Sequence, residues 1–218
     1  LFLTSQGLSQ EDSFIRVDQD DDRLCVYVVE SNGHKYKRPV LDIHLKDWIR
    51  FAEFTLKVKE RYGFFKRKYK HRKYIRIQTV DSIFYDSSSI TIQGRLSDKN
   101  TYSCQATWAN DCLDLIVKSH HKQYQSTHLT MLREKDNHFF GAGQQHSYVR
   151  LNDKGFNMLV QEQGIGAGDQ PVSWIANTQM AGGSPTHCYA PIPYFSDNQN
   201  RGTLLMNTEP SRLNFKRP

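Results

Sequence analysis

Short strand-like segments separated by turn residues follow one another along the middle of the chain, and their spacing limits the possible folds most strongly. They recur at intervals of about ten residues, as the strands of sandwiches and barrels do, and they carry many β-branched and aromatic residues. Clusters of Asp, Ser and Asn, which favour tight turns, stand between them. The pattern predicts an antiparallel meander in a sandwich or barrel. The expected strands are Tyr74–Val80, Ser82–Tyr85, Ser89–Gly94, Thr101–Thr107 and Leu113–Lys118.

The first third of the chain adds strands to this pattern. We predict strands at Ser13–Asp18 and Arg23–Glu30, joined by the acidic turn Asp18–Asp22. The Asn32-Gly33 pair then predicts a tight turn, because both residue types tolerate positive φ. Asp47–Lys59 is ambiguous, but alternation in its C-terminal half favours a strand there. Since no segment predicts a helix, the expected fold class is all-β.

The length of the chain limits the number of domains that it can form. A chain of 218 residues is long enough for one large β domain with a real core, and we expect a single domain over residues 1–218. The chain stops, just after Lys216-Arg217, inside sequence that has the character of a strand, so we expect a domain that is incomplete at its C-terminus through processing or truncation.

The net charge of +6 allows polyanion binding. No apolar run approaches the ~20 residues that a membrane-spanning helix needs, so we expect no membrane span.

Four cysteines bear on the compartment. They contain no CxxC pair, which disfavours zinc-knuckle and thioredoxin-type sites. Cys104 and Cys112 can face each other across a short hairpin, which would allow a disulfide in an oxidising compartment. The alternative is four small buried thiols. From the possible disulfide we expect a secreted protein, or a protein of the lysosome or another lumen.

Most of the excess positive charge lies between Lys57 and Arg76. A basic run of this kind can bind heparin, RNA or an anionic lipid surface through sulfate or phosphate contacts. The alternative is a solvated strand or loop whose neighbouring aromatic residues turn inward. The candidate polyanion-binding residues are Lys66, Arg67, Lys68, Lys70, Arg72 and Lys73.

The sequence gives little support for a nucleotide-binding loop, a metal site or a serine nucleophile. The glycines of Gly164–Gly168 resemble a phosphate-binding loop, but Pro171 follows them and should break the helix that such a site needs. The nine histidines do not repeat at metal-ligand spacing. No G-x-S-x-G nucleophile elbow is present. We expect no nucleotide, metal or other cofactor.

The segment Gly141–Tyr194 is rich in Gly, Gln, Pro and Asn and looks like loops between short strands. Loops this long in a compact domain are usually functional, so we expect the function to depend on this segment. Three carboxylates lie in or near it, at Glu162, Asp169 and Asp197. Paired carboxylates suit glycosyl transfer, but we favour capping of loop amides for all three.

Four motifs of this segment are specific in their order and spacing. They are Phe140–Tyr148 (FGAGQQHSY), Glu162–Gly166 (EQGIG), Gly168–Pro171 (GDQP), and Ala181–Gly183 leading to Tyr189–Pro193 (YAPIP). Together they resemble the N-terminal β-sandwich domain of glycoside hydrolase family 31, closest to the sulfoquinovosidase-like α-glycosidases. The resemblance spans most of the chain, strongly after Ile75, and implies the galactose-mutarotase-like antiparallel supersandwich fold.

The resemblance also implies that the sandwich and the catalytic domain have separate roles. In that family the two catalytic aspartates lie in a (β/α)8 barrel that follows the sandwich, so this chain alone is expected not to be catalytic. The sandwich packs on the barrel and lends a loop to the rim of the active site, which makes the barrel and a carbohydrate the expected partners. Gln side chains can donate to and accept from sugar hydroxyls, and aromatic rings can stack on a sugar face or anchor the loops. The residues expected on the rim are Glu162, Gln163, Gln170, Trp174 and Tyr189.

Two positions depart from the family pattern. Gln144 stands where the family usually has Glu, and Ala167 stands where it tends to carry Arg. Losing these two charges implies either an altered rim or a relative that has abandoned catalysis. The alternative function is therefore a non-catalytic binding or structural protein built on the same sandwich, with glycans or polyanions as ligands.

Overall fold

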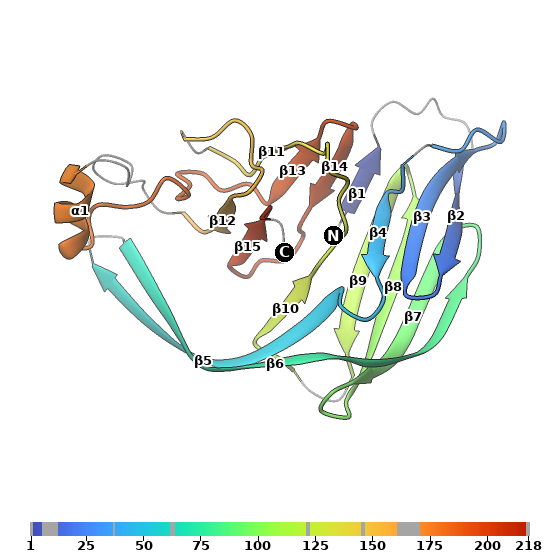
Figure 1. Ribbon diagram of the computed structural model, residues 1–218, viewed down its shortest axis with the longest axis horizontal. Helices are drawn as coiled ribbons and strands as arrows, with labels where there is room; N and C mark the ends of the chain where they lie inside the picture. Colours follow the sequence, from blue (N-terminus) through green and yellow to red (C-terminus); the bar gives the residue numbers. More distant parts are fainter. Residues whose placement is uncertain are drawn as a thin grey trace. The chain divides into compact units, whose positions relative to one another are not determined.

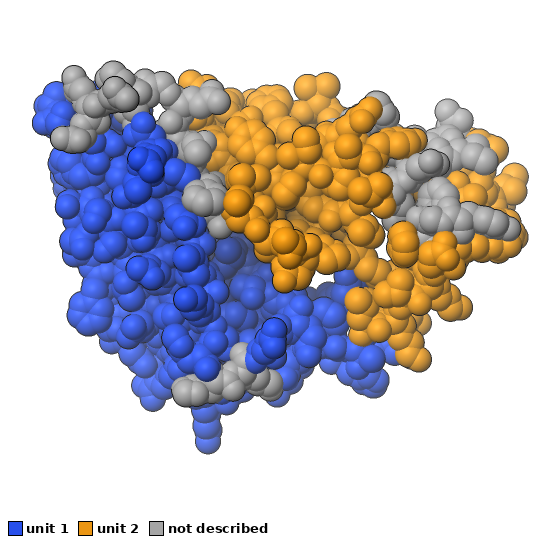
Figure 2. All heavy atoms as spheres, turned by 180° about the vertical axis from the view of Figure 1, so that it is seen from behind, with its two compact units in different colours: residues 1–55, 69–135 blue, residues 56–68, 136–218 orange. Residues whose placement is uncertain are grey.

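The computed structural model describes residues 2–5, 13–36, 38–61, 64–120, 123–144, 147–160 and 171–216. The chain divides into two compact units (Figure 2). Unit 1 comprises Leu1–Thr55 and Tyr69–Lys135, and unit 2 comprises Leu56–Lys68 and Asp136–Pro218. None of the helices in the described part of the chain is both long and apolar enough to cross a membrane.

Unit 1 contains two groups of strands (Figure 1). Three strands form one sheet in the order β2-β3-β4, and seven lie in a second sheet in the order β10-β5-β6-β7-β8-β9-β1. The strands from β6 to β9, and then β1, pair antiparallel with their neighbours. The bounds are β1 Phe2–Ser5, β2 Ser13–Asp20, β3 Arg23–Glu30, β4 Leu41–His44, β5 Ile49–Arg61, β6 Phe64–Tyr85, β7 Ser89–Leu96, β8 Thr101–Ala109, β9 Cys112–Ser119 and β10 Ser126–Leu129.

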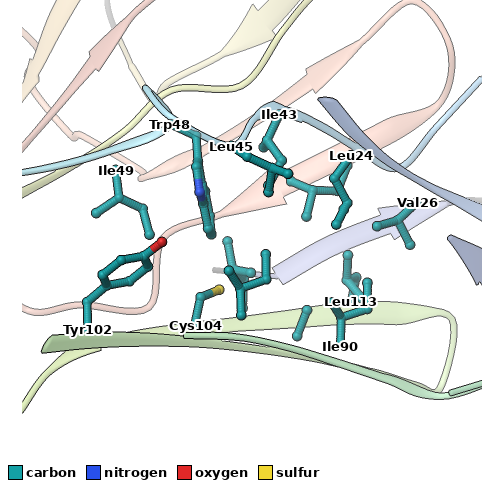
Figure 3. Close-up of a cluster of buried hydrophobic side chains, with 14 of the residues drawn as sticks. Leu24, Val26, Ile43, Leu45, Trp48, Ile49, Ile90, Tyr102, Cys104 and Leu113 are labelled. Carbon is teal, nitrogen blue, oxygen red and sulfur yellow. The ribbon is translucent and has the colours of Figure 1, made fainter. Parts of the chain in front are cut away.

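The core of unit 1 lies between these two sheets. Along β7 and β8 every second side chain is buried, as the two-residue period of a strand requires when one face is covered. Figure 3 shows side chains such as Leu24 and Trp48 pointing towards Tyr102 and Cys104 of β8. Burial of each large apolar side chain stabilises the fold by about 1.5–3 kcal/mol. The all-β sandwich predicted from the sequence is confirmed.

The strand predictions hold in most places. β2, β3, β7, β8 and β9 match the predicted segments within a few residues, and the predicted turn after β3 contains Gly33 at φ +83°. The predicted strands Tyr74–Val80 and Ser82–Tyr85 are instead parts of the single strand β6. Its pairing with β7 shifts register between Val80 and Ser82, so a bulge and not a turn accounts for the break in the sequence pattern.

The structure excludes one of the two cysteine alternatives and contradicts the expected absence of helices. Cys104 lies opposite Val117 and Cys112 lies opposite Ala109 in the β8–β9 pairing, so the two cysteines do not face each other. All four cysteines are free thiols. The chain also has a helix, α1 (Pro171–Thr178), where none was expected. Pro171 begins this helix, because proline is disfavoured inside a helix but suits its first position, where the backbone N–H has no helical partner.

Unit 2 is built from short elements around a separate core. The strands β14-β13-β11 lie side by side, and β12 pairs with β15. Phe139, Phe195 and Phe215 contact one another through their rings beside the buried Phe156 and Leu151. The bounds are β11 Phe139–Gly141, β12 Gly155–Met158, β13 Tyr194–Asp197, β14 Arg201–Leu204 and β15 Ser211–Asn214.

Candidate functional site

The first and last family-like motifs lie against each other in unit 2. β11 pairs with β13, and beyond β11 the amide of Ala142 donates to the Tyr194 carbonyl at 2.8 Å. Gln144 then exchanges two backbone hydrogen bonds: its amide donates to Ala190 at 2.9 Å, and its carbonyl accepts from Tyr189 at 3.0 Å. The Phe140–Tyr148 motif is therefore joined by its backbone to Tyr189–Pro193.

Glycine is required where these two segments approach. Gly141, Ala142 and Gly143 all have positive φ, at +113°, +65° and +86°. A Cβ at Gly143 would collide with the backbone of Ala190 and Ile192, and one at Gly141 would lie 2.8 Å from the Tyr194 carbonyl oxygen. Glycine permits both the positive φ and the close backbone approach.

Helix α1 is fixed to the Ala181–Gly183 motif at its C-terminal end. The amide of Ala181 donates to the Ala176 carbonyl at 2.9 Å, and that of Met180 donates to the Asn177 carbonyl at 3.1 Å. Met180 has φ +62°, so this is a Schellman ending with Met in the position usually taken by glycine. A Cβ at Gly182 would collide with the Ser173 carbonyl oxygen and the Asn177 side chain. The packed face of α1 is thus the small and polar one.

The large apolar side chains of α1 are exposed. Val172, Trp174 and Ile175 are 45%, 75% and 62% exposed, whereas Ser173 is fully buried. A helix on the surface of a domain normally turns its apolar residues inward. The reversed pattern is typical of interaction surfaces, which exposed apolar side chains gathered on one element often mark.

The expected rim residues divide into two groups. Trp174 of α1 is exposed, and Tyr189 is 38% exposed beside Gln144. Gln144 itself has an exposed side chain. Glu162, Gln163 and Gln170 lie outside the described residues, as do Asp169 and Ala167. Val172 and Ile175 were not predicted, because Pro171 indicated the end of a helix and not its first residue.

Asp197 caps the turn between β13 and β14. Its carboxylate accepts from the amides of Gln199 and Arg201 at 2.9 and 3.1 Å, and from the Arg201 guanidinium at 2.8 and 2.5 Å. The side chain of Asp197 is 5% exposed. A carboxylate occupied in this way holds the turn together, and the interpretation of Asp197 as a cap for loop amides is confirmed.

The basic run lies on β6, shared between the units. Lys66, Arg67 and Lys68 belong to unit 2, and Lys70, Arg72 and Lys73 to unit 1. Arg72 takes part in a structural cluster: its guanidinium lies 4.5 Å from the Tyr69 ring centroid, and Nη1 donates to the Tyr74 hydroxyl at 3.0 Å. Phe65, Tyr69 and Tyr74 are 39–44% exposed, so these aromatic rings do not turn fully inward.

Unit 1 also has a pocket, of about 420 Å³. Its aromatic wall is Tyr124, whose ring lies 4.9 Å from that of Phe51 and whose hydroxyl donates to Asp98 at 2.7 Å. That bond and burial, which is the larger cause, raise the pKa of Tyr124 to about 12. The other lining residues are mainly polar. The pocket is lined by Phe51, Val117, Ser119, His120, Gln123, Tyr124 and Thr127. Within the described ranges, no three His, Cys, Asp or Glu side chains gather as metal ligands do.

The solved structures that resemble this chain include one that covers nearly all of it. The chain matches a GH31 family sulfoquinovosidase from E. rectale, solved in complex with the aza-sugar inhibitor IFGSQ, with a TM-score of 0.72 and 14% sequence identity. The match shows the fold. It covers 93% of this chain and 29% of the enzyme's chain, so this chain spans less than a third of that protein. No protein-family model and no curated protein matches the sequence.

Proposed function

We propose that this chain is the N-terminal β-sandwich of a family-31-like α-glycosidase, where it supports a (β/α)8 barrel and lends a loop to the rim of the active site. The observation that carries the proposal is the fold match, which takes in nearly all of this chain and a minor part of the E. rectale enzyme. Most of that enzyme lies beyond the match, as expected if a sandwich is attached to a larger catalytic segment.

In this proposal α1 and the loop that carries Tyr189 contact the barrel. Val172, Trp174 and Ile175 expose apolar area that a partner surface would cover, and each such side chain stabilises a complex when water leaves it. The backbone bonds between Gln144 and Tyr189–Ala190 hold the neighbouring loop rigid. Rigid support of this kind is what a residue at an active-site rim requires.

Activity of the protein from its natural source tests the proposal. The chain should be isolated together with a barrel that carries two catalytic aspartates, on the same polypeptide or a second one, and the preparation should hydrolyse an aryl α-glycoside. Isolation of the chain as a stable monomer without a barrel and without this activity would show that the proposal is wrong.

A second candidate function is glycan binding without catalysis, and the pocket in unit 1 favours it. An aromatic wall beside hydroxyl, amide and imidazole groups is a common arrangement for holding a sugar. Gln144, in place of the family's Glu, removes a charge from the loop of unit 2.

A matched pair of variants tests the second candidate. Gln123 lines the pocket, whereas Gln125 is equally exposed on the same segment but is not part of the lining. On a glycan array, Gln123→Ala should lose binding and Gln125→Ala should keep it. Equal binding by the two variants, or α-glycosidase activity of the natural protein, would rule this candidate out.

A further inference from the structure

The ends of β5 and β6 form a hairpin arm, defined here as Leu56–Arg61 and Phe65–Lys68. Figure 1 shows them as a two-stranded ribbon that reaches towards α1, and Arg61 Nη1 donates to the Gln179 side chain there at 3.0 Å. Every side chain of Leu56–Arg61 is exposed, and only Arg67 is half-buried among Phe65–Lys68. A strand inside a sandwich buries every second side chain, so the arm differs from the rest of its sheet.

A ring contact at the base of the arm identifies its two faces. Phe54 and Tyr69 lie with their ring centroids 5.0 Å apart and therefore share one face. Because side chains alternate along a strand, Leu56 and Val58 follow Phe54, and Phe65 and Arg67 follow Tyr69. The opposite face then carries Lys57 and Lys59 from β5, and Lys66 and Lys68 from β6.

These four lysines form the cationic face. Two lysines follow each other along each strand at a spacing of about 6.6–6.8 Å, and neighbouring strands lie about 4.8 Å apart. Among the described residues, none of the four makes an ion pair. Two adjacent rows of unpaired ammonium groups are complementary to a linear chain that carries repeated anionic groups.

We propose that the cationic face binds a linear sulfated glycan. Lysine ammonium groups contact sulfate as point charges and need no aromatic platform. Single-stranded nucleic acid is a poorer match, because its bases stack on aromatic side chains between the cations, and Phe65 and Tyr69 lie on the other face. An anionic membrane is also a poorer match, because Leu56 and Val58 point away from the lysines and one flat surface cannot take up both.

Heparin binding by the full protein tests this proposal. The test variant carries Lys57→Gln, Lys59→Gln, Lys66→Gln and Lys68→Gln. The control carries Lys46→Gln, Lys118→Gln, Lys135→Gln and Lys216→Gln, four other exposed lysines. Both changes lower the net charge from +6 to +2 (6 − 4 = 2). Circular dichroism and thermal melting confirm that both remain folded, and the two double variants, Lys57/Lys59 and Lys66/Lys68, repeat the test with fewer changes.

The test variant should bind immobilised heparin at least about 100-fold more weakly than the control at 0.15 M NaCl. Its plot of log Kd against log salt concentration should be shallower by about three, because each lost contact removes roughly 0.7–0.9 from the slope. Equal losses in the two variants, or no heparin binding by the unchanged protein, would overturn the proposal. Stronger binding to a 24-nucleotide single-stranded DNA or to phosphatidylserine vesicles, dependent on the same lysines, would overturn the choice of glycan.

Discussion

The amide of Gln144 donates to the carbonyl oxygen of Ala190 at 2.9 Å, and Gly143 brings the two backbones this close. This contact joins two motifs that are far apart in the sequence and supports the loop that carries Tyr189. The rigidity of the proposed rim therefore depends on the absence of a side chain at one position.

Gly143→Ala is expected to destabilise the protein by about 2 kcal/mol more than Gly33→Ala. Both glycines have left-handed φ, +86° and +83°, so alanine costs each about 1 kcal/mol of backbone strain. A Cβ at Gly143 also collides with the Ala190 backbone, whereas one at Gly33 meets nothing within 4 Å. Urea unfolding of the two variants measures the difference, and equal losses would show that the contact with Ala190 is not tight.

Asp197→Ala is expected to lower the free energy of unfolding by about 3 kcal/mol, because it leaves Arg201 and two turn amides without their buried acceptor. Asp197→Asn keeps a carbonyl oxygen for the amides and should cost roughly half as much. Thermal unfolding compares the two. A loss below about 1 kcal/mol for Asp197→Ala, the value for an exposed ion pair, would contradict the role assigned to this carboxylate.

A thiol reagent at pH 8 is expected to modify Cys112 in the folded protein and the other three cysteines only after unfolding. Burial raises the pKa of Cys104 to about 12 and also raises the pKa values of Cys25 and Cys188, so few thiolates form there. Mass spectrometry of the native and denatured protein counts the modified sites. Fewer than four reactive thiols after unfolding without a reductant would reveal a disulfide and contradict the structure.

Stability should fall as the pH drops below about 6.5, the ordinary pKa of histidine. Burial and the positive charges of Arg72 and Arg50 lower the pKa of His128 in the folded state. Below the unfolded pKa the unfolded chain binds this proton and the folded chain does not, so stability is lost until the pH reaches the lower, folded value. His128→Gln should flatten this part of the curve. A curve for His128→Gln identical to that of the unchanged protein would contradict the effect.

The strands were predictable because their signal is local. Alternation along β7 and β8 and the turn residues between them act within about ten residues, and the sandwich follows from that pattern. Helix α1 was missed because Pro171 was interpreted as a helix breaker and because a helix of 8 residues is too short for apolar periodicity to reveal it. A proline in a sequence can either end a helix or occupy its first position, and the sequence alone did not distinguish these two roles for Pro171.

The candidate site was predictable in part. The motif that contains Gly141 and Gly143 could be recognised in the sequence, but its partner near Ala190 is set by tertiary packing. The free state of Cys104 and Cys112 depends on the register of β8 and β9, which spacing alone does not determine. The number of positive charges likewise does not reveal which basic side chains contact one another. The structure divides them between the cationic face and a cluster around Arg72.

Site-specific photo-crosslinking tests the central proposal most directly. A benzophenone amino acid replaces Trp174 on α1 or, as the control, Val149, which is 86% exposed elsewhere in unit 2. Each substitution is made in the full natural protein, which is then irradiated, and the crosslinked peptides are sequenced by mass spectrometry. The proposal predicts that position 174 crosslinks to a (β/α)8 barrel segment and that position 149 does so far less. No barrel peptide from position 174, or equal yields from the two positions, would contradict the assignment of this sandwich to a glycosidase barrel.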